Sequence, residues 1–484
     1  MRCCHPAPWI VGPVLMLGAA PVFAAAETER TPRRPNIIVI VADDLGYADI
    51  GVQGCKDVPT PQIDSIARNG VRFSNGYVSC PVCSPTRAGL ITGRYQQRFG
   101  HEFNPGQLGQ AAARARATQP TTPAVTFGLP LDEVTLADRL KSAGYATGMV
   151  GKWHLGDKPP YRPLRRGFEE YYGFLGGAHP YVDLKASDRA PIFRGNESLD
   201  ENEYLTDAFA REAVAYIDRH KKQPFFLYLT FNAVHTPQQV PDKYLARFGE
   251  IQDPKRRSMA AMLSAMDDGI GRVLGKIRSE SLENDSLIFF ISDNGGPTKG
   301  NGSLNTPFTG FKGGLNEGGI RVPFLVQWKG QIPPGRVYDR AIISLDIHPT
   351  ALAAASPEKP LDIPADKALD GVNLLPFLRA EKSGAPHEVL FWRFGRQAAV
   401  RKGDVKLLRI QGQTTLYDLS KDPAEERDLS AEKPELVKEL TAALAKWESE
   451  LKKPLWPQTR ARAAAAREAT GNRQRQGRRA TQTP

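Results

Sequence analysis

The fold of this chain is decided by the stretch NIIVIVADD at residues 36–44, an apolar run that ends in two aspartates. Further apolar runs lie at 225–231, 287–291 and 322–328. Continuous runs of β-branched and aromatic residues predict strands that are buried on both faces. Helical patterns lie between them, at 60–69, 135–143, 204–221 and 258–278. This alternation predicts an α/β fold, a mixed sheet flanked by helices.

Polar side chains gather where the predicted strands end. Asp43 and Asp44 follow the first run, His235 follows the second, and Asp293 and Asn294 follow the third. In open α/β sheets, ligands bind outside the carboxyl ends of the strands. The convergence of such residues from distant segments therefore predicts an enzyme site at this edge.

The C-terminal part of the chain has a different pattern. Short strands with turns are predicted at 389–394, 398–401, 406–408 and 415–418, and an amphipathic helix at 434–451. They predict a smaller subdomain, an antiparallel sheet with a helix. We therefore expect a signal peptide at 1–24, a catalytic domain at 34–375, the C-terminal subdomain at 376–457 and a disordered basic tail at 458–484. Residues 105–130, rich in Ala, Gln, Thr and Pro, are expected to form a long loop.

The N-terminus is typical of a secretory signal. Arg2 precedes a short apolar run at 9–20, and Val22-Phe23-Ala24 has the small-x-small pattern of a cleavage site. The run is too short to cross a bilayer, so we predict an exported protein, periplasmic or secreted, with no integral membrane span.

Three cysteines remain after such a cleavage, Cys55, Cys80 and Cys83. An odd number in an exported protein means that one thiol is free, paired between chains or chemically converted. Cys80 and Cys83 match C-x-x-C, but a second such pair is missing, which disfavours a redox or zinc site. Pairing of Cys55 with Cys80 stays open.

The charge balance raises an alternative of a different class. The formal net charge is +11, from 64 Lys+Arg against 53 Asp+Glu, which a non-catalytic glycan- or nucleic-acid-binding protein could use. However, residues 458–484 hold seven arginines and one glutamate, with no aromatic after Trp456. Binders of single-stranded nucleic acid interleave aromatics with basic residues. We therefore expect no nucleic-acid partner, and glycan binding without catalysis is the remaining alternative.

A motif at Cys83-Ser84-Pro85-Thr86-Arg87, followed by Thr92-Gly93-Arg94, resembles the signature of the type I sulfatases. Four further segments match that family in order: the strand at 35–44, the second signature at 144–154, the Ser-Asp-Asn-Gly at 292–295 and the Gly-rich segment at 312–319. Thr86 stands where serine is commoner. The resemblance implies an alkaline-phosphatase-like fold.

The resemblance also explains the odd cysteine. In this family the motif cysteine is oxidised to formylglycine by a dedicated maturation enzyme, which implies this fate for Cys83. One oxygen of its hydrated aldehyde would attack sulfur, and the second hydroxyl would let the covalent sulfate ester break down. This is nucleophilic catalysis through an activated oxygen.

The remaining carboxylates suit a metal ion. Asp43, Asp44, Asp293 and Asn294 offer hard oxygen ligands, which favour Ca²⁺ or Mg²⁺ over zinc. The resemblance implies Ca²⁺, with residue Cys83 also coordinating.

The resemblance further assigns roles to cations and histidines. It implies that Arg87 stabilises the formylglycine diol and that Lys152 and Lys312 bind sulfate. His154 would hold or deprotonate residue 83, and His235 would protonate the leaving alcohol. In the fold that the resemblance implies, the segments of His101 and His179 lie near the mouth of the pocket, so we also predict sugar contacts by these two histidines and by Arg98.

We therefore predict a sulfatase that acts on a sulfated carbohydrate, such as a sulfated galactose or N-acetylgalactosamine unit. The segments at 100–105 and 128–133 are similar to bacterial arylsulfatase-like and N-acetylgalactosamine-6-sulfatase-like proteins. The alternatives are a broad arylsulfatase for small aryl sulfates and a phosphate or phosphonate ester hydrolase of the same superfamily. The oligomeric state is not predicted.

Overall fold

The computed structural model describes residues 33–105, 127–188, 190–358 and 363–456, with a few isolated positions before residue 9. The predicted tail at 458–484, most of the predicted loop at 105–130 and nearly all of the predicted signal peptide lie outside the described residues. Within the described part of the chain, every helix is too short or too polar to cross a bilayer.

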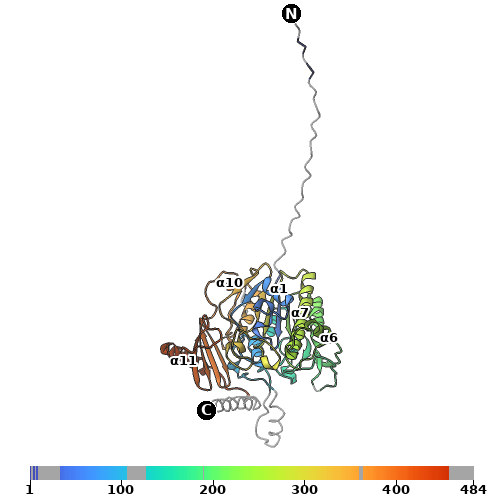
Figure 1. The fold of residues 1–484 in the computed structure, drawn as a ribbon. Helices are drawn as coiled ribbons and strands as arrows, with labels where there is room; N and C mark the ends of the chain where they lie inside the picture. The colour runs from blue at the N-terminus through green and yellow to red at the C-terminus, as the bar shows by residue number, and fades with distance from the viewer. Residues whose placement is uncertain are drawn as a thin grey trace. The chain divides into compact units, whose positions relative to one another are not determined.

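A ten-stranded mixed sheet forms the centre of the fold (Figure 1), in the order β11-β2-β10-β9-β1-β8-β4-β5-β6-β7. Its five parallel central strands are β9 (Ser286–Ser292), β1 (Asn36–Ala42), β8 (Phe225–Thr230), β4 (Ala146–Lys152) and β5 (Glu170–Phe174). The flanking strands are β10 (Phe324–Gln327), β2 (Val71–Phe73), β11 (Arg336–Tyr338), β6 (Ile192–Arg194) and β7 (Glu197–Leu199). β10 runs antiparallel to β9, so the predicted mixed sheet is confirmed.

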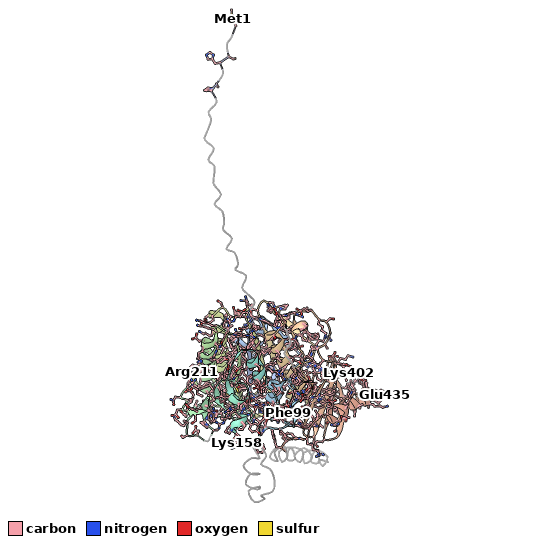
Figure 2. All side chains as sticks on the ribbon, turned by 180° about the vertical axis from the view of Figure 1, so that it is seen from behind. Met1, Phe99, Lys158, Arg211, Lys402 and Glu435 are labelled. Carbon is pink, nitrogen blue, oxygen red and sulfur yellow. The ribbon has the colours of Figure 1, made fainter. Side chains whose placement is uncertain are left out.

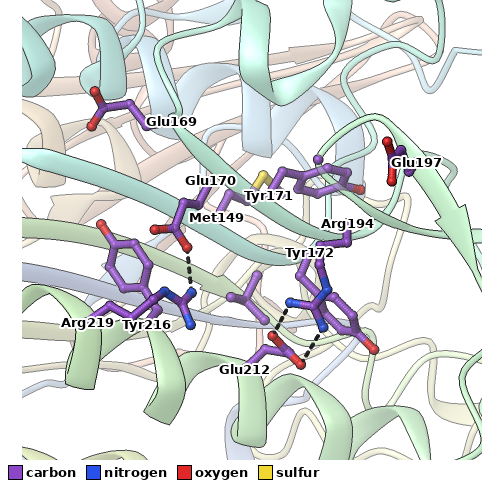
Figure 3. A pocket seen from close by; sticks show the side chains of 12 residues that line it. Met149, Glu169, Glu170, Tyr171, Tyr172, Arg194, Glu197, Glu212, Tyr216 and Arg219 are labelled. Carbon is purple, nitrogen blue, oxygen red and sulfur yellow. Dashed lines mark hydrogen bonds and ion pairs between the residues drawn. The ribbon is translucent and has the colours of Figure 1, made fainter.

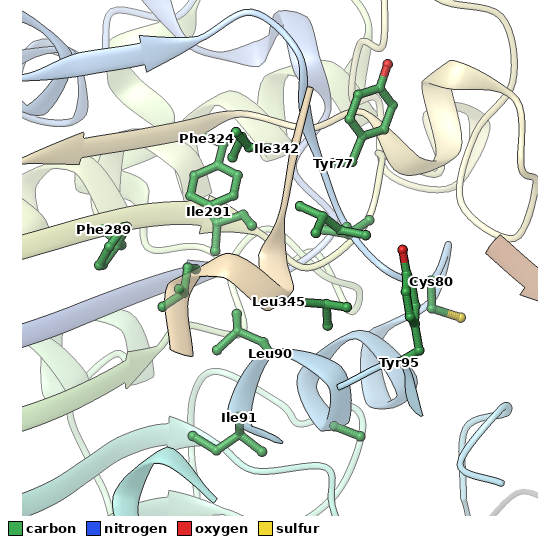
Figure 4. Close-up of a cluster of buried hydrophobic side chains, with 14 of the residues drawn as sticks. Tyr77, Cys80, Leu90, Ile91, Tyr95, Phe289, Ile291, Phe324, Ile342 and Leu345 are labelled. Atoms are coloured by element: carbon green, nitrogen blue, oxygen red, sulfur yellow. The ribbon is translucent and has the colours of Figure 1, made fainter. Parts of the chain in front are cut away.

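Both faces of this sheet are covered by helices. In β1, Ile37 and Val39 belong to one apolar core, and Ile38 belongs to the other. The first core takes in α2 (Cys83–Thr92), α4 (Leu136–Ser142), α9 (Ile347–Ala355) and α10 (Leu375–Leu378), and the second takes in α1 (Pro61–Arg68), α5 (Leu205–His220), α6 (Asp242–Leu245) and α7 (Pro254–Ser279). Figure 4 shows Leu90 of α2 beside Leu345 in the first core. A strand buried on both faces needs the continuous apolar run that its sequence shows.

β4 was not among the predicted strands, although it lies between β8 and β5. Its sequence ATGMVGK holds two glycines, which disfavour strands. The packing explains them: a Cβ at Gly148 would lie 2.2 Å from the Tyr216 ring, and one at Gly151 would lie 1.9 Å from the Thr230 carbonyl oxygen. Glycine here marks a close approach between neighbouring elements.

The C-terminal sheet follows the sequence pattern closely. It consists of β13 (Val389–Phe394), β14 (Gln397–Lys402), β15 (Val405–Ile410) and β16 (Gln413–Asp418), all antiparallel, with α11 (Pro434–Ser449) beside it. Lys402 and Glu435 mark this sheet and helix in Figure 2. This confirms the predicted antiparallel sheet with a helix. Its buried Trp392 and Leu407 belong to the same apolar core as α2, and the boundary at residue 375 stays a prediction. Three further short elements are the paired strands β3 (Gly76–Tyr77) and β12 (Ile342–Ile343) and the helix α8 (Glu317–Ile320).

Candidate active site

Two neighbouring strands deliver the acidic residues. Asp43 and Asp44 follow β1, and Asp293 follows β9. In the parallel register Ala42 lies opposite Ser292, so the residues after both strands meet at one edge. One carboxylate oxygen from each aspartate and the Cys83 Sγ all lie within 4.8 Å of one another. Side chains that are 250 residues apart in sequence thus form one cluster.

Cys83 is the first residue of α2 and is 1% exposed. Its Sγ lies 3.6 Å from Asp43 Oδ1. Burial raises the pKa of the Cys83 thiol to about 12, because it outweighs the lowering by the positive charges of Lys152 and Lys312. The unmodified side chain is therefore a neutral thiol at pH 7, which is a poor nucleophile.

Three cationic side chains balance the three carboxylates. Lys152, the last residue of β4, places its Nζ 2.5 Å from Asp43 Oδ2, and Lys312 places its Nζ 2.5 Å from Asp44 Oδ1. Arg87 donates from Nε and one terminal nitrogen to Asp293 Oδ2, at 3.0 and 2.7 Å.

These pairings shift the protonation of the carboxylates. Burial alone would raise the pKa of Asp43, but Lys152 and the other neighbouring positive charges together outweigh it and hold that pKa below its usual range. Burial and the charge of Asp43 raise the pKa of Asp293. A divalent cation added to this balanced cluster would leave it net positive, which suits an anionic ligand.

Two histidines border the cluster. His235 is 18% exposed at its side chain, and its Nε2 lies 3.7 Å from Asp44 Oδ2. Its Nδ1 lies 2.5 Å from the Thr236 carbonyl oxygen, which can only accept, so Nδ1 carries a proton. His154 lies two residues beyond β4 with a φ of +58°, and burial together with Lys152 lowers its pKa well below the usual value. His154 is therefore neutral at pH 7.

The donor set fits a hard cation such as Ca²⁺. The Asn294 side-chain nitrogen donates to Asp44 Oδ1 at 2.7 Å, whereas its Oδ1 is buried and has no hydrogen-bond partner among the described residues. A buried, unpartnered carbonyl oxygen is costly unless something binds it. Beside three carboxylates, this oxygen supplies the ligand type that Ca²⁺ prefers.

The three predicted sugar contacts are engaged elsewhere. Arg98 pairs with Asp370 and Glu450, both at 2.9 Å. His101 is fully buried against Ser84, and both ring nitrogens of His179 lie 2.7 Å from backbone carbonyl oxygens. Sugar contact by these residues stays a prediction, and it would require each side chain to exchange its present partners.

Two residues near the site were missed at the level of sequence. Ser84 Oγ donates to the His154 carbonyl oxygen at 2.6 Å and accepts from His101 Nε2 at 2.7 Å, so it links the two histidines. A Cβ at Gly177 would lie 2.5 Å from His154 Nε2, so only glycine leaves room for that ring. Ser84 is the second residue of the Cys83 motif, and Gly177 belongs to a Gly-Gly pair. Neither pattern indicates that the residue contacts a histidine ring.

A separate cavity of about 480 Å³ lies beside the first residues of β5 (Figure 3). Four glutamates and two arginines line it, and Arg194 pairs with Glu212 while Arg219 pairs with Glu170. The excess of carboxylates disfavours an anionic ligand there. It contains none of the predicted site residues.

Comparison with known proteins decides the family. The sequence profile described as "Sulfatase" matches residues 35–357, more than half of the chain. The chain belongs to the sulfatase family. Its resemblance to the type I sulfatases is thereby confirmed. A second profile, "N-sulphoglucosamine sulphohydrolase, C-terminal", matches residues 312–452 of this sulfatase.

Individual relatives agree with this assignment. The sulfatase chain is 33% identical to the N-acetylgalactosamine-6-sulfatase of Sus scrofa over 362 residues, 71% of this chain and 66% of that protein, slightly under two thirds of its length. It is 32% identical to the uncharacterized sulfatase YdeN of Escherichia coli, over 75% of this chain and 69% of that protein. Among solved structures, Ps i-CgsB superimposes with a TM-score of 0.79 at 35% identity, covering 88% of this chain and 95% of that one.

Proposed function

We propose that this protein hydrolyses sulfate esters of a sulfated carbohydrate, with Cys83 converted to formylglycine and with Ca²⁺ bound. The observation that carries the proposal is the buried cluster in which Cys83 lies among three carboxylates and three cations. Sulfate esters are anions that gain charge on the leaving oxygen as they react. Fixed positive groups in a buried site stabilise that charge.

The three cationic side chains have two different roles, orienting a carboxylate and binding the sulfate group. Arg87 is fully buried and donates two hydrogen bonds to Asp293, so it orients that carboxylate, and we propose that it stabilises the formylglycine diol at residue 83. Lys152 and Lys312 each hold a carboxylate through a single contact. With a metal ion bound to those carboxylates, their ammonium groups become available to the sulfate oxygens.

Asp43, Asp44, Asp293 and Asn294 would hold the Ca²⁺, together with residue 83. When bound, the ion supplies positive charge that polarises the sulfate group. Conversion of Cys83 to formylglycine supplies an oxygen nucleophile, which the neutral, buried thiol cannot replace.

The two histidines are the proposed proton donor and acceptor. The Nδ1 of His235 is bonded to the Thr236 carbonyl oxygen, so Nε2 is the nitrogen that can donate a proton to the leaving alcohol when the ring is charged. His154 is neutral and buried, and its carbonyl and ring are fixed by Ser84 and Gly177. We propose that it holds or deprotonates residue 83.

A sulfated saccharide is the proposed substrate class. The relative from Sus scrofa is named for N-acetylgalactosamine-6-sulfate, and Ps i-CgsB has been solved in complex with a k-i-k-neocarrahexaose at 34% identity to this chain. We propose a sulfated galactose or N-acetylgalactosamine unit, in a protein exported through the signal at 1–24 and matured by a formylglycine-generating enzyme.

A desulfation screen tests this proposal. Protein produced with a competent maturation system is incubated with defined sulfated saccharides, an aryl sulfate, and matched phosphate and phosphonate esters, and the released anion is measured. Release of sulfate from a saccharide, abolished in Cys83→Ala, supports the proposal. Faster release from the aryl sulfate or from phosphorus esters favours the corresponding alternative. Saccharide binding without any release, with sulfur retained at residue 83, indicates a glycan-binding protein.

A further inference from the structure

The loop that carries Lys312 is held from two sides. The Gly313 N–H donates to the Pro81 carbonyl oxygen at 2.8 Å, which ties the loop to the turn before Cys83. The loop is rich in glycine, and Gly310 and Gly313 have φ values of +91° and +90°. Such a segment has much conformational freedom to lose, so it needs further bonds to keep Lys312 in one place.

Those further bonds come from the C-terminal sheet. The Gln397 side-chain nitrogen donates to the Gly313 carbonyl oxygen at 3.0 Å, and its Oε1 accepts from the Leu315 N–H at 3.1 Å. Gln397 is the first residue of β14 and is paired on both sides, with Phe394 of β13 and Ile410 of β15. Its backbone is therefore rigid, and its amide bridges two peptide groups of the loop.

A second contact from the same sheet reinforces the bridge. The buried Lys406 of β15 donates to the Leu315 carbonyl oxygen and to Glu317 Oε1, both at 2.8 Å. Leu315 itself is fully buried in the apolar core. The segment after Lys312 is thus held at three alternate residues, 313, 315 and 317, while Lys312 Nζ lies beside Asp44 Oδ1.

We propose that Gln397 is a positioning residue for the sulfate site, acting through the backbone of residues 313–315 to place the Lys312 ammonium. The C-terminal sheet is then part of the site machinery, although it supplies no group to the acidic cluster itself. This inference rests on the proposed function, because it assumes that Lys312 binds the sulfate group.

The test compares Gln397→Met with Gln413→Met. Methionine keeps the length of the side chain but neither hydrogen bond, and Gln413 is an exposed residue of the same sheet. We expect Gln397→Met to lower kcat/KM for the saccharide found in the screen, and to weaken binding of inorganic sulfate to the calcium-loaded protein in calorimetry, each roughly 10-fold. Gln413→Met should leave both unchanged. Gln397→Glu keeps an oxygen that can accept from the Leu315 N–H, so its kcat/KM and its sulfate affinity should fall less than those of Gln397→Met.

A double-variant cycle separates positioning from general structure. If Gln397 acts through Lys312, adding Gln397→Met to Lys312→Met should change kcat/KM by less than about twofold. The inference is overturned if Gln397→Met lowers kcat/KM equally in the wild-type and Lys312→Met backgrounds. It is also overturned if Gln397→Met and Gln413→Met have the same kcat/KM and the same affinity for inorganic sulfate. If the wild type releases no sulfate from any ester, the proposed function fails instead. The calorimetric comparison with inorganic sulfate then still decides whether Gln397 governs anion binding.

Discussion

Replacement of Ser84 by alanine tests how the motif around Cys83 is built. The Ser84 hydroxyl makes two short bonds in a buried setting, to the His154 carbonyl oxygen at 2.6 Å and from His101 Nε2 at 2.7 Å. Alanine leaves both partners without a bond, and each such loss costs about 1–3 kcal/mol. His154 also has a positive φ, which costs about 1–2 kcal/mol in a non-glycine residue. Without Ser84, the backbone at His154 can relax and move the His154 ring.

We therefore expect Ser84→Ala to lower the free energy of unfolding by about 2–4 kcal/mol and to lower kcat by roughly 10-fold or more. Urea unfolding measures the first quantity, and sulfate release measures the second. Because Ser84 lies in the motif that we propose directs maturation, peptide mass analysis must give the fraction of converted Cys83. Activity is then expressed per converted site.

Thr86→Val is the matched control. Thr86 lies in the same helix and motif, and its hydroxyl donates to the Cys80 carbonyl oxygen at 2.7 Å, with no bond to either histidine. We expect it to cost about 1 kcal/mol of stability and to leave kcat per converted site unchanged. Wild-type turnover per converted site in Ser84→Ala, or an equal loss in Thr86→Val, would refute the positioning of His154 by Ser84.

Three further predictions concern other parts of the molecule. Lys406→Met leaves Glu317 and Glu425 buried without their shared cation and should destabilise the protein by about 3–5 kcal/mol in urea unfolding, whereas adding Glu425→Gln should restore part of that loss. His348 is buried, which lowers its pKa to about 3, so the unfolded chain binds more protons than the folded one between about pH 6.5 and 3. Stability should therefore fall on acidification in that window by about 1.4 kcal/mol per pH unit from this residue, and an unchanged slope in His348→Gln would contradict this. Asn294→Leu removes the unpartnered oxygen and should weaken calcium binding roughly 10-fold or more, seen as a smaller calcium-induced rise in Tm than in the wild type.

Much of the fold could be predicted because its strands and helices carry strong local patterns. The run at 36–42 is apolar without a break, and a strand covered on both faces requires this. In the C-terminal sheet, β13 alternates buried and half-buried residues, which is the period of a strand with one covered face. The strand β4 could not be predicted because its glycines are required by close contacts with Tyr216 and Thr230. Those contacts come from distant segments, so no local sequence pattern indicates them.

The sequence by itself determined the family, the strand ends on which acidic residues gather, and the residue types that a sulfate site needs. The tertiary structure alone decided which of these residues meet. The parallel register of β1 and β9 brings Asp43 to Asp293, and the packing of the C-terminal sheet brings Gln397 to the Lys312 loop. The fold also brings His101 against Ser84, a contact that the local motif does not show. A motif specifies chemistry through residue type and local spacing, whereas contacts between distant segments depend on register and close packing, which are properties of the whole fold.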